Sequence, residues 1–156
     1  MKNPPVTEKI TVRYQDLDPY GHVNNAVHLA LCESVRVAYM RELARSMDLG
    51  DLQAGDISGM RYLVAEASLS YKAPIFLDDV VHGAARISYI SNRSCGMEYE
   101  LRTGESYETG RTAAEGSTAL VFYDPDTEEV RPRPEWFLSA VAALEDRPEE
   151  DFQREG

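Results

Sequence analysis

Asp16-Leu17-Asp18-Pro19-Tyr20-Gly21-His22-Val23-Asn24-Asn25 is a ten-residue run that places two carboxylates, a turn, a histidine and two asparagines before a helical segment. Pro19 and Gly21 make the chain turn within this run. The pattern from about residue 25 to residue 47 is helical, and an asparagine at 24 or 25 can cap it by accepting a hydrogen bond from a free amide. Residues 26–32 carry no Asp, Glu, Lys or Arg. A helix that is apolar nearly all round at one end is buried there, so we expect it to run through the middle of the domain.

Alternation of apolar and polar residues predicts one strand before this helix and four after it. The expected strands cover residues 7–14, 63–71, 81–89, 95–101 and 108–123. The residues expected to share a face are Leu63, Ala65, Ala67, Leu69 and Tyr71 in the second strand, Val81, Gly83, Ala85, Ile87 and Tyr89 in the third, and Cys95, Met97, Tyr99 and Leu101 in the fourth. Consecutive strands with short connections are usually antiparallel. The sequence therefore predicts an α+β fold in which an antiparallel sheet wraps around the long helix, because this arrangement buries both.

The length of 156 residues suits one compact domain, with a core that we expect between about residues 8 and 145. Residues 51–59 are expected to form a loop. A short amphipathic helix is predicted from Trp136 to Leu144. The chain after this helix is an acidic tail, and we expect its last dozen residues to fray.

Composition excludes several classes of protein. The formal net charge is −11, from 27 acidic and 16 basic residues. Such a surface repels a phosphate backbone, so nucleic acid is not expected as a partner. No uncharged apolar stretch reaches the roughly 18 residues of a membrane span, and the first residues lack the apolar segment of a secretory signal. We therefore expect a cytoplasmic protein without a membrane partner, in which Cys32 and Cys95 are buried, reduced thiols.

The order of residues around the helix start favours chemistry on a carbonyl group. The first amides of a helix lack intrahelical partners, and the helix dipole adds partial positive charge there. An oxyanion that forms from a carbonyl oxygen would be stabilised by such amides. A carboxylate on the preceding loop can attack the carbonyl carbon or activate a water that does so. Both parts of an acyl-transfer site are thus present within ten residues.

The sequence resembles the acyl-CoA thioesterases of the 4-hydroxybenzoyl-CoA thioesterase type, within the hotdog superfamily. Residues 14–25 before a long helix are the specific part of this resemblance, which extends over about residues 8–145. Weaker parts are Val64-Ala65-Glu66-Ala67-Ser68, Tyr71-Lys72-Ala73-Pro74, Phe76-Leu77-Asp78-Asp79 and Phe122-Tyr123-Asp124-Pro125-Asp126-Thr127. The resemblance implies a hotdog fold and hydrolysis of an acyl-CoA, with coenzyme A as part of the substrate and no cofactor. It also implies a homo-oligomer, either a dimer or a homotetramer, with active sites at a dimer interface.

The resemblance also implies roles for individual residues. Asp18 corresponds to the catalytic carboxylate of the family, and the backbone amide that polarises the thioester carbonyl corresponds to that of Asn25. The His-Val-Asn-Asn sequence is similar to that of plant-type acyl-carrier-protein thioesterases, in which the histidine, here His22, is assigned a role. Those enzymes carry an asparagine where this chain has Tyr20. The expected catalytic residues are therefore Asp18, Asn25 and His22, and the expected substrate-binding residues are Tyr20, Asn24, Tyr71 and Lys72.

Two other functions remain open at this stage. The first is release of an acyl chain from a carrier protein, and the second is binding of an acyl-CoA without hydrolysis. Asp16 is expected to stabilise the loop, and His28 and Cys32 are expected to be core residues. The histidines and cysteines lack the spacing of metal ligands, so no metal site is expected.

Overall fold

The computed structural model describes residues 1–49 and 60–154, and the predicted loop at residues 51–59 lies outside this range. The elements are β1 (Val6–Thr11), η1 (Tyr14–Asp16), α1 (Val27–Ser46), β2 (Tyr62–Tyr71), β3 (Val80–Ile90), β4 (Ser94–Thr103), β5 (Arg111–Asp124), β6 (Glu129–Val130), α2 (Phe137–Glu145) and η2 (Glu149–Asp151). The strands form an antiparallel sheet in the order β1-β3-β4-β5-β2, with β6 paired to β5. The predicted α+β arrangement is confirmed.

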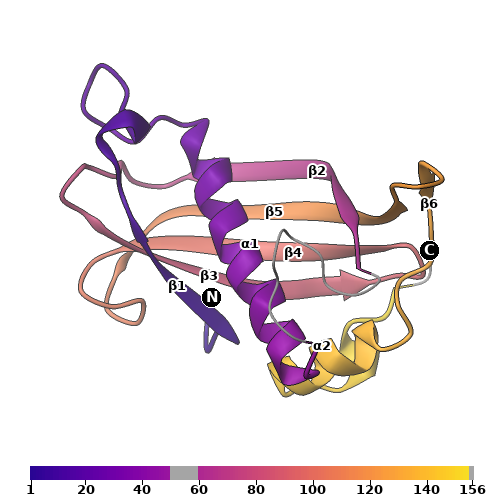
Figure 1. The fold of residues 1–156 in the computed structure, drawn as a ribbon. Coiled ribbons are helices and arrows are strands. Elements are labelled where there is room, and N and C mark those ends of the chain that lie inside the picture. Colours follow the sequence, from indigo (N-terminus) through magenta and orange to yellow (C-terminus); the bar gives the residue numbers. More distant parts are fainter. Residues whose placement is uncertain (50–59, 155–156) are drawn as a thin grey trace.

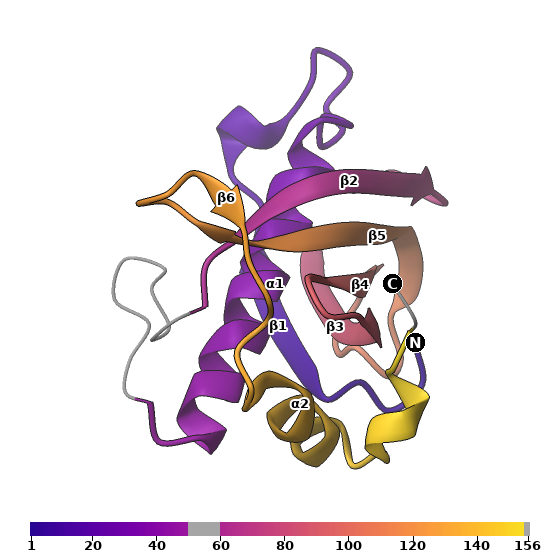
Figure 2. The same cartoon turned by 90° about the vertical axis from the view of Figure 1, so that its right-hand side faces the viewer.

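The long helix α1 lies across one face of the sheet, which curls around it (Figures 1 and 2). Its buried residues are His28, Leu31, Cys32, Val35, Arg36, Tyr39, Met40, Leu43 and Ala44. These recur at intervals of three and four, which places them on one side of the helix. Helix α2 covers the far end of α1 (Figure 2) and buries Phe137 and Val141 completely. No helix among the described residues is long and apolar enough to cross a membrane.

At two β-bulges the strand faces differ from the prediction, which was wrong there. In β2 the pairing with β5 shifts between Val64 and Glu66, so Leu63 lies on the opposite face from Ala67. In β3 the pairing with β4 shifts between Ile87 and Tyr89. Ile90 is therefore buried in place of the predicted Tyr89. A bulge inserts one unpaired residue and reverses the alternation beyond it.

The segment after α2 is ordered as far as Arg154, so the expectation that the last dozen residues fray is wrong for the described part of it. The Phe152 side chain is fully buried and belongs to the core. The Ile90 amide donates to the Phe152 carbonyl oxygen at 2.6 Å, and the Arg154 amide donates to the Ile90 carbonyl oxygen at 3.0 Å. The end of the acidic tail is thereby tied to the end of β3.

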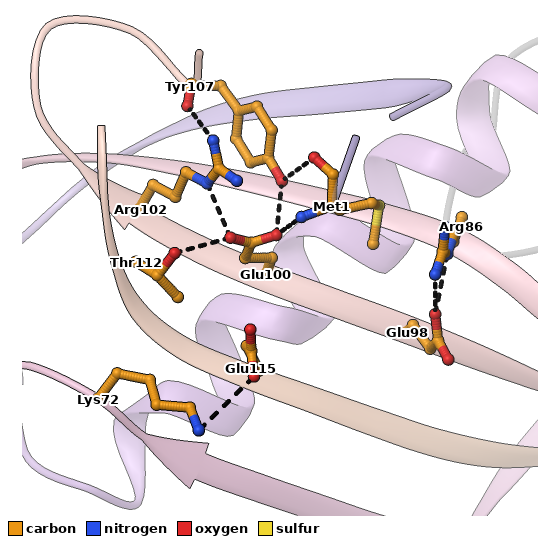
Figure 3. A network of polar contacts seen from close by, with 9 residues as sticks. All are labelled: Met1, Lys72, Arg86, Glu98, Glu100, Arg102, Tyr107, Thr112 and Glu115. Atoms are coloured by element: carbon orange, nitrogen blue, oxygen red, sulfur yellow. Dashed lines mark hydrogen bonds and ion pairs between the residues drawn. The ribbon is translucent and has the colours of Figure 1, made fainter. Parts of the chain in front are cut away.

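The face of the sheet that points away from α1 carries a polar network around Glu100 (Figure 3). The Glu100 carboxylate accepts hydrogen bonds from Arg102 Nε at 2.8 Å, the Tyr107 hydroxyl at 3.0 Å and the Thr112 hydroxyl at 2.8 Å. It also contacts the α-amino group of Met1. These charges are therefore partnered within the chain, and the loop that the sequence singles out lies elsewhere, at the start of α1.

Candidate functional site

The loop before α1 is a closed turn held by backbone hydrogen bonds. The Asp18 amide donates to the His22 carbonyl oxygen at 2.7 Å, and the Asn24 amide donates to the Asp16 carbonyl oxygen at 2.8 Å. Gly21 has a φ of +81°, a conformation that a glycine adopts without strain. The loop therefore holds its two carboxylates in fixed positions relative to the helix start.

Asp16 is a structural residue, as predicted. Its buried carboxylate accepts hydrogen bonds from Arg13: from the backbone amide at 2.8 Å, from Nε at 3.3 Å and from a terminal guanidinium nitrogen at 2.8 Å. The hydrogen bonds from Arg13 hold the pKa of the Asp16 carboxyl below its usual value. This carboxylate fixes the end of the loop and is occupied by its partners.

Asp18 differs from Asp16 because only one of its oxygens is engaged. Asp18 Oδ1 accepts hydrogen bonds from the backbone amides of Tyr20 at 2.9 Å and of His22 at 3.1 Å. Among the described residues, none donates a hydrogen bond to Oδ2. These contacts orient the carboxylate like a turn aspartate and leave one oxygen for a substrate or a water.

The start of α1 presents a free amide. The Asn24 side chain caps the helix, since its Oδ1 accepts a hydrogen bond from the Ala26 amide at 2.9 Å. The Asn24 carbonyl oxygen accepts a hydrogen bond from the Val27 amide at 2.9 Å. The intervening Asn25 amide donates no hydrogen bond within residues 1–49 and 60–154. It is the unpartnered amide that the sequence predicts at this point.

Asp18 and Asn25 line the same cavity, of about 350 Å³. The cavity is bounded by Asp18, His22, Val23, Asn25, His28, Tyr71, Lys72, Ala73 and Pro74. The end of β2 thus meets the loop and the helix start. The Tyr71 hydroxyl donates a hydrogen bond to the Asn25 carbonyl oxygen at 2.9 Å, and Lys72 forms an ion pair with Glu115 at 3.7 Å.

The structure brings five of the seven predicted site residues to this cavity. They are Asp18, His22, Asn25, Tyr71 and Lys72. Tyr20 is 85% exposed at the tip of the loop, and Asn24 faces the helix as its cap, so neither lines the cavity. His28, which the sequence analysis assigned to the core, is buried as predicted, but it also lines the cavity, which that analysis did not predict. Its position four residues after the capping Asn24 was the available signal, because residues four apart are neighbours on a helix.

Neither cysteine is a candidate nucleophile. Both Cys32 and Cys95 are buried, as predicted, and burial raises the pKa of each thiol to about 12. A thiol with such a pKa is protonated near neutral pH and reacts poorly. Within the described residues no three His, Cys, Asp or Glu side chains gather as a potential metal-binding group. The carboxylate of Asp18 is therefore the group best placed for chemistry in the cavity.

A curved antiparallel sheet around one helix, with a carboxylate and a helix-terminal amide at one cavity, defines a hotdog protein with the parts for acyl chemistry. The sequence matches the Thioesterase-like superfamily over residues 12–141, and the chain belongs to this family of thioesterases. A comparison with curated proteins found no match.

Solved structures agree with this assignment. A Thermus thermophilus thioesterase, determined in complex with coenzyme A and zinc, is 33% identical, with a TM-score of 0.76 over 95% of this chain and 100% of that chain. Two further structures share the fold. A thioesterase superfamily protein from a Jannaschia species is 21% identical, with a TM-score of 0.73 over 90% of this chain and 83% of that one. A 1,4-dihydroxy-2-naphthoyl-CoA thioesterase from Synechocystis is 22% identical, with a TM-score of 0.70 over 91% of this chain and 98% of that one.

Proposed function

We propose that this thioesterase hydrolyses acyl-CoA thioesters, with Asp18 as the catalytic carboxylate and the Asn25 amide as the oxyanion donor. The observation that carries the proposal is that Asp18 and Asn25 line one cavity at the start of α1. The coenzyme A bound by the Thermus thermophilus relative supports this class of substrate. Lys72, at the edge of the same cavity, is a cation that can approach a phosphate of the coenzyme.

The reaction follows from the positions of these groups. The thioester carbonyl oxygen accepts a hydrogen bond from the Asn25 amide, where the helix dipole also favours negative charge. Asp18 takes a proton from a water, and the resulting hydroxide adds to the carbonyl carbon. The oxyanion then collapses, the carbon–sulfur bond breaks, and the proton held by Asp18 passes to the leaving sulfur, so the products are a carboxylic acid and the thiol of coenzyme A. The first bond to carbon is the step that the Asn25 amide accelerates.

A second version of this chemistry uses Asp18 as the nucleophile. Its free oxygen would add to the carbonyl carbon, expel the thiolate and form an acyl anhydride that water then hydrolyses. Rapid quenching of a single turnover distinguishes the two versions. An acyl group covalently attached to Asp18 supports the nucleophilic version, and its absence during turnover supports the general base.

The proposal is tested by hydrolysis of short, medium, long and aromatic acyl-CoAs by the wild type and Asp18→Asn. Asparagine keeps an oxygen that can accept the hydrogen bonds from Tyr20 and His22, so the loop is retained. We expect the rate to fall by a factor on the order of 10²–10⁴. Release of the thiol is followed with a thiol reagent, and the acyl group that is cleaved fastest identifies the preferred substrate.

Asp16→Asn is the matched control in the same loop. It removes a charge that pairs with Arg13 and touches nothing in the cavity. We expect a loss of thermal stability and a smaller loss of rate than in Asp18→Asn. Equal activity of Asp18→Asn and the wild type would show that Asp18 is not the catalytic carboxylate. Turnover of a carrier-bound acyl group, with no turnover of the matched acyl-CoA, would overturn the substrate class.

We also propose that two copies of the chain associate through β2. Among the described strands β2 is the last of the sheet, so the backbone groups along its outer side have no partner strand there. Its side chains Leu63, Val64 and Tyr71 are exposed, and Leu29 of the neighbouring helix is exposed as well. A second β2 would cover this apolar edge. Light scattering should show at least a dimer for the wild type and a smaller species for Val64→Lys, whereas a monomeric wild type would contradict the association.

A further inference from the structure

His28 is a buried histidine at the cavity for which the proposed reaction has no role. It is 4% exposed, lies in the first turn of α1, and lines the cavity together with Asp18 and Asn25. Its Nδ1 lies 3.1 Å from the Asn24 carbonyl oxygen. A carbonyl oxygen can only accept a hydrogen bond, so Nδ1 carries the proton and donates it.

The carbonyl that His28 binds belongs to the same peptide group as the Asn25 amide. The Asn24–Asn25 peptide is trans, so its C=O and N–H point in opposite directions. The carbonyl oxygen points into the helix, where the Val27 amide at 2.9 Å and His28 Nδ1 both donate to it. The N–H therefore points out of the helix end, on the side from which an oxyanion would approach.

We propose that His28 is a positioning residue for the oxyanion-binding amide, an inference that rests on the proposed function. A hydrogen bond to the carbonyl oxygen of a peptide polarises the whole group and strengthens donation by its N–H. It also fixes the plane of the peptide, and with it the direction of the N–H. The second nitrogen of the ring plays no part in this role.

Contacts around His28 hold the ring in the orientation that this role requires. The Tyr71 ring packs edge to face against the His28 ring, with centroids 4.9 Å apart. The Tyr71 hydroxyl donates to the Asn25 carbonyl oxygen. One side chain from β2 thus contacts both the positioning histidine and the next peptide of the chain. The two peptides on either side of the Asn25 α-carbon are each held by a side chain.

The other nitrogen of His28 faces a different environment. Within residues 1–49 and 60–154, Arg36 Nε is the one buried side-chain polar atom without a hydrogen-bond partner. His28 Nε2 has no hydrogen bond among these residues either, and since it is not one of the buried unpartnered atoms, part of its surface is accessible. Two roles are therefore separable by experiment, because one uses Nδ1 and the other would use Nε2 on a reacting group.

Substitutions that replace one nitrogen at a time test the proposal. In His28→Asn the amide nitrogen can take the place of Nδ1, and in His28→Gln it can take the place of Nε2, while His28→Leu has neither. We expect kcat of His28→Leu and His28→Gln to fall roughly tenfold to a hundredfold. His28→Asn should recover most of this loss. KM should change little throughout, because the oxyanion exists only in the transition state.

A signal from the peptide itself separates positioning from a loss of packing. The chain has four asparagines, Asn3, Asn24, Asn25 and Asn92, and one Asn-Asn pair. Asparagine labelled with carbonyl ¹³C and backbone ¹⁵N therefore gives one coupled NMR signal, from the Asn24–Asn25 peptide. We expect this signal to shift in His28→Leu and His28→Gln and to return toward its wild-type position in His28→Asn.

The opposite order of activity, with His28→Gln active and His28→Asn inactive, would overturn the proposal that His28 positions the Asn25 amide. It would show instead that His28 acts through Nε2. An unchanged peptide signal in a folded His28→Leu would also overturn the proposal. If the wild type hydrolyses no acyl-CoA, the proposed function fails, whereas the labelled peptide still tests the contact from His28. Thermal unfolding of all three variants establishes that each one is folded before its activity is compared.

Discussion

Gly83→Ala tests the closest approach between the helix that carries the site and the sheet. A methyl group added at Gly83 of β3 would lie 2.2 Å from Cγ2 of Val35 and 3.3 Å from Cδ2 of Leu101. Val35 is fully buried on α1, and a β-branched side chain in a helix has one strongly preferred rotamer. Rotation of Val35 out of this rotamer is costly, so we expect α1 to move away from β3.

The cost of such overpacking is about 1–3 kcal/mol in the free energy of unfolding. For a domain of this size, that corresponds to a fall in Tm of roughly 2–12 °C. Both quantities are measured by denaturant and thermal unfolding. Because Asn25 lies at the start of α1, a displaced helix should also lower kcat, and the two losses should appear together.

A double-mutant cycle with Val35→Ala provides the control. Val35→Ala alone should cost about 2 kcal/mol, because it removes two buried methyl groups and leaves a cavity. In the double variant the new methyl at Gly83 occupies part of that cavity. The two effects should therefore be coupled by at least about 1 kcal/mol, as expected for residues in contact. Additive losses would show that α1 does not pack on β3 at Gly83.

Two further predictions concern the C-terminal segment. The Glu145 side chain, 2% exposed, accepts hydrogen bonds from the Tyr39 hydroxyl and the Ile87 amide, and burial raises the pKa of its carboxyl. A carboxyl group whose pKa is higher in the folded than in the unfolded state stabilises the fold most at a pH below its unfolded-state pKa of about 4.3. This stabilisation is lost as the pH rises through the folded-state pKa. Glu145→Gln should therefore gain stability relative to the wild type as denaturation is repeated from pH 4 toward pH 7, and a constant difference would refute this. Phe152→Ala should lose about 3–5 kcal/mol because its ring is fully buried, with Phe152→Leu losing less, and an unchanged unfolding curve would show that the tail is not anchored.

Sequence periodicity located the elements well and their faces less well. The predicted helix at about 25–47 is α1 at Val27–Ser46, and the predicted strand at 63–71 is β2 at Tyr62–Tyr71. The faces failed at the bulges in β2 and β3, because a bulge depends on the pairing with the neighbouring strand. Nothing in the alternation of Ile87 and Tyr89 indicates that Ile90 is the buried residue.

The acidic tail shows a second limit of prediction from the sequence, here from average composition. Its charges predicted a frayed segment, and Asp146, Glu149, Glu150 and Asp151 are indeed exposed. One aromatic residue, Phe152, anchors the segment to the core, since a fully buried aromatic side chain contributes several times the stabilisation of an exposed ion pair. Average polarity over a dozen residues conceals a single anchoring side chain.

The candidate site could be predicted from the sequence where its contacts join residues that are close together in the chain. Asp18 and Asn25 are joined by six residues of turn and cap, whose hydrogen bonds follow from the local sequence. Tyr71 is the last residue of β2 and Lys72 follows it, and only the pairing of the sheet brings them to the loop. His28 was within reach, because it stands four residues from the capping asparagine. Its place in an apolar stretch of the helix predicted a core residue, yet the acceptor of its hydrogen bond is the peptide on which the proposed chemistry depends. The partner of a buried polar group therefore says more about function than its burial does.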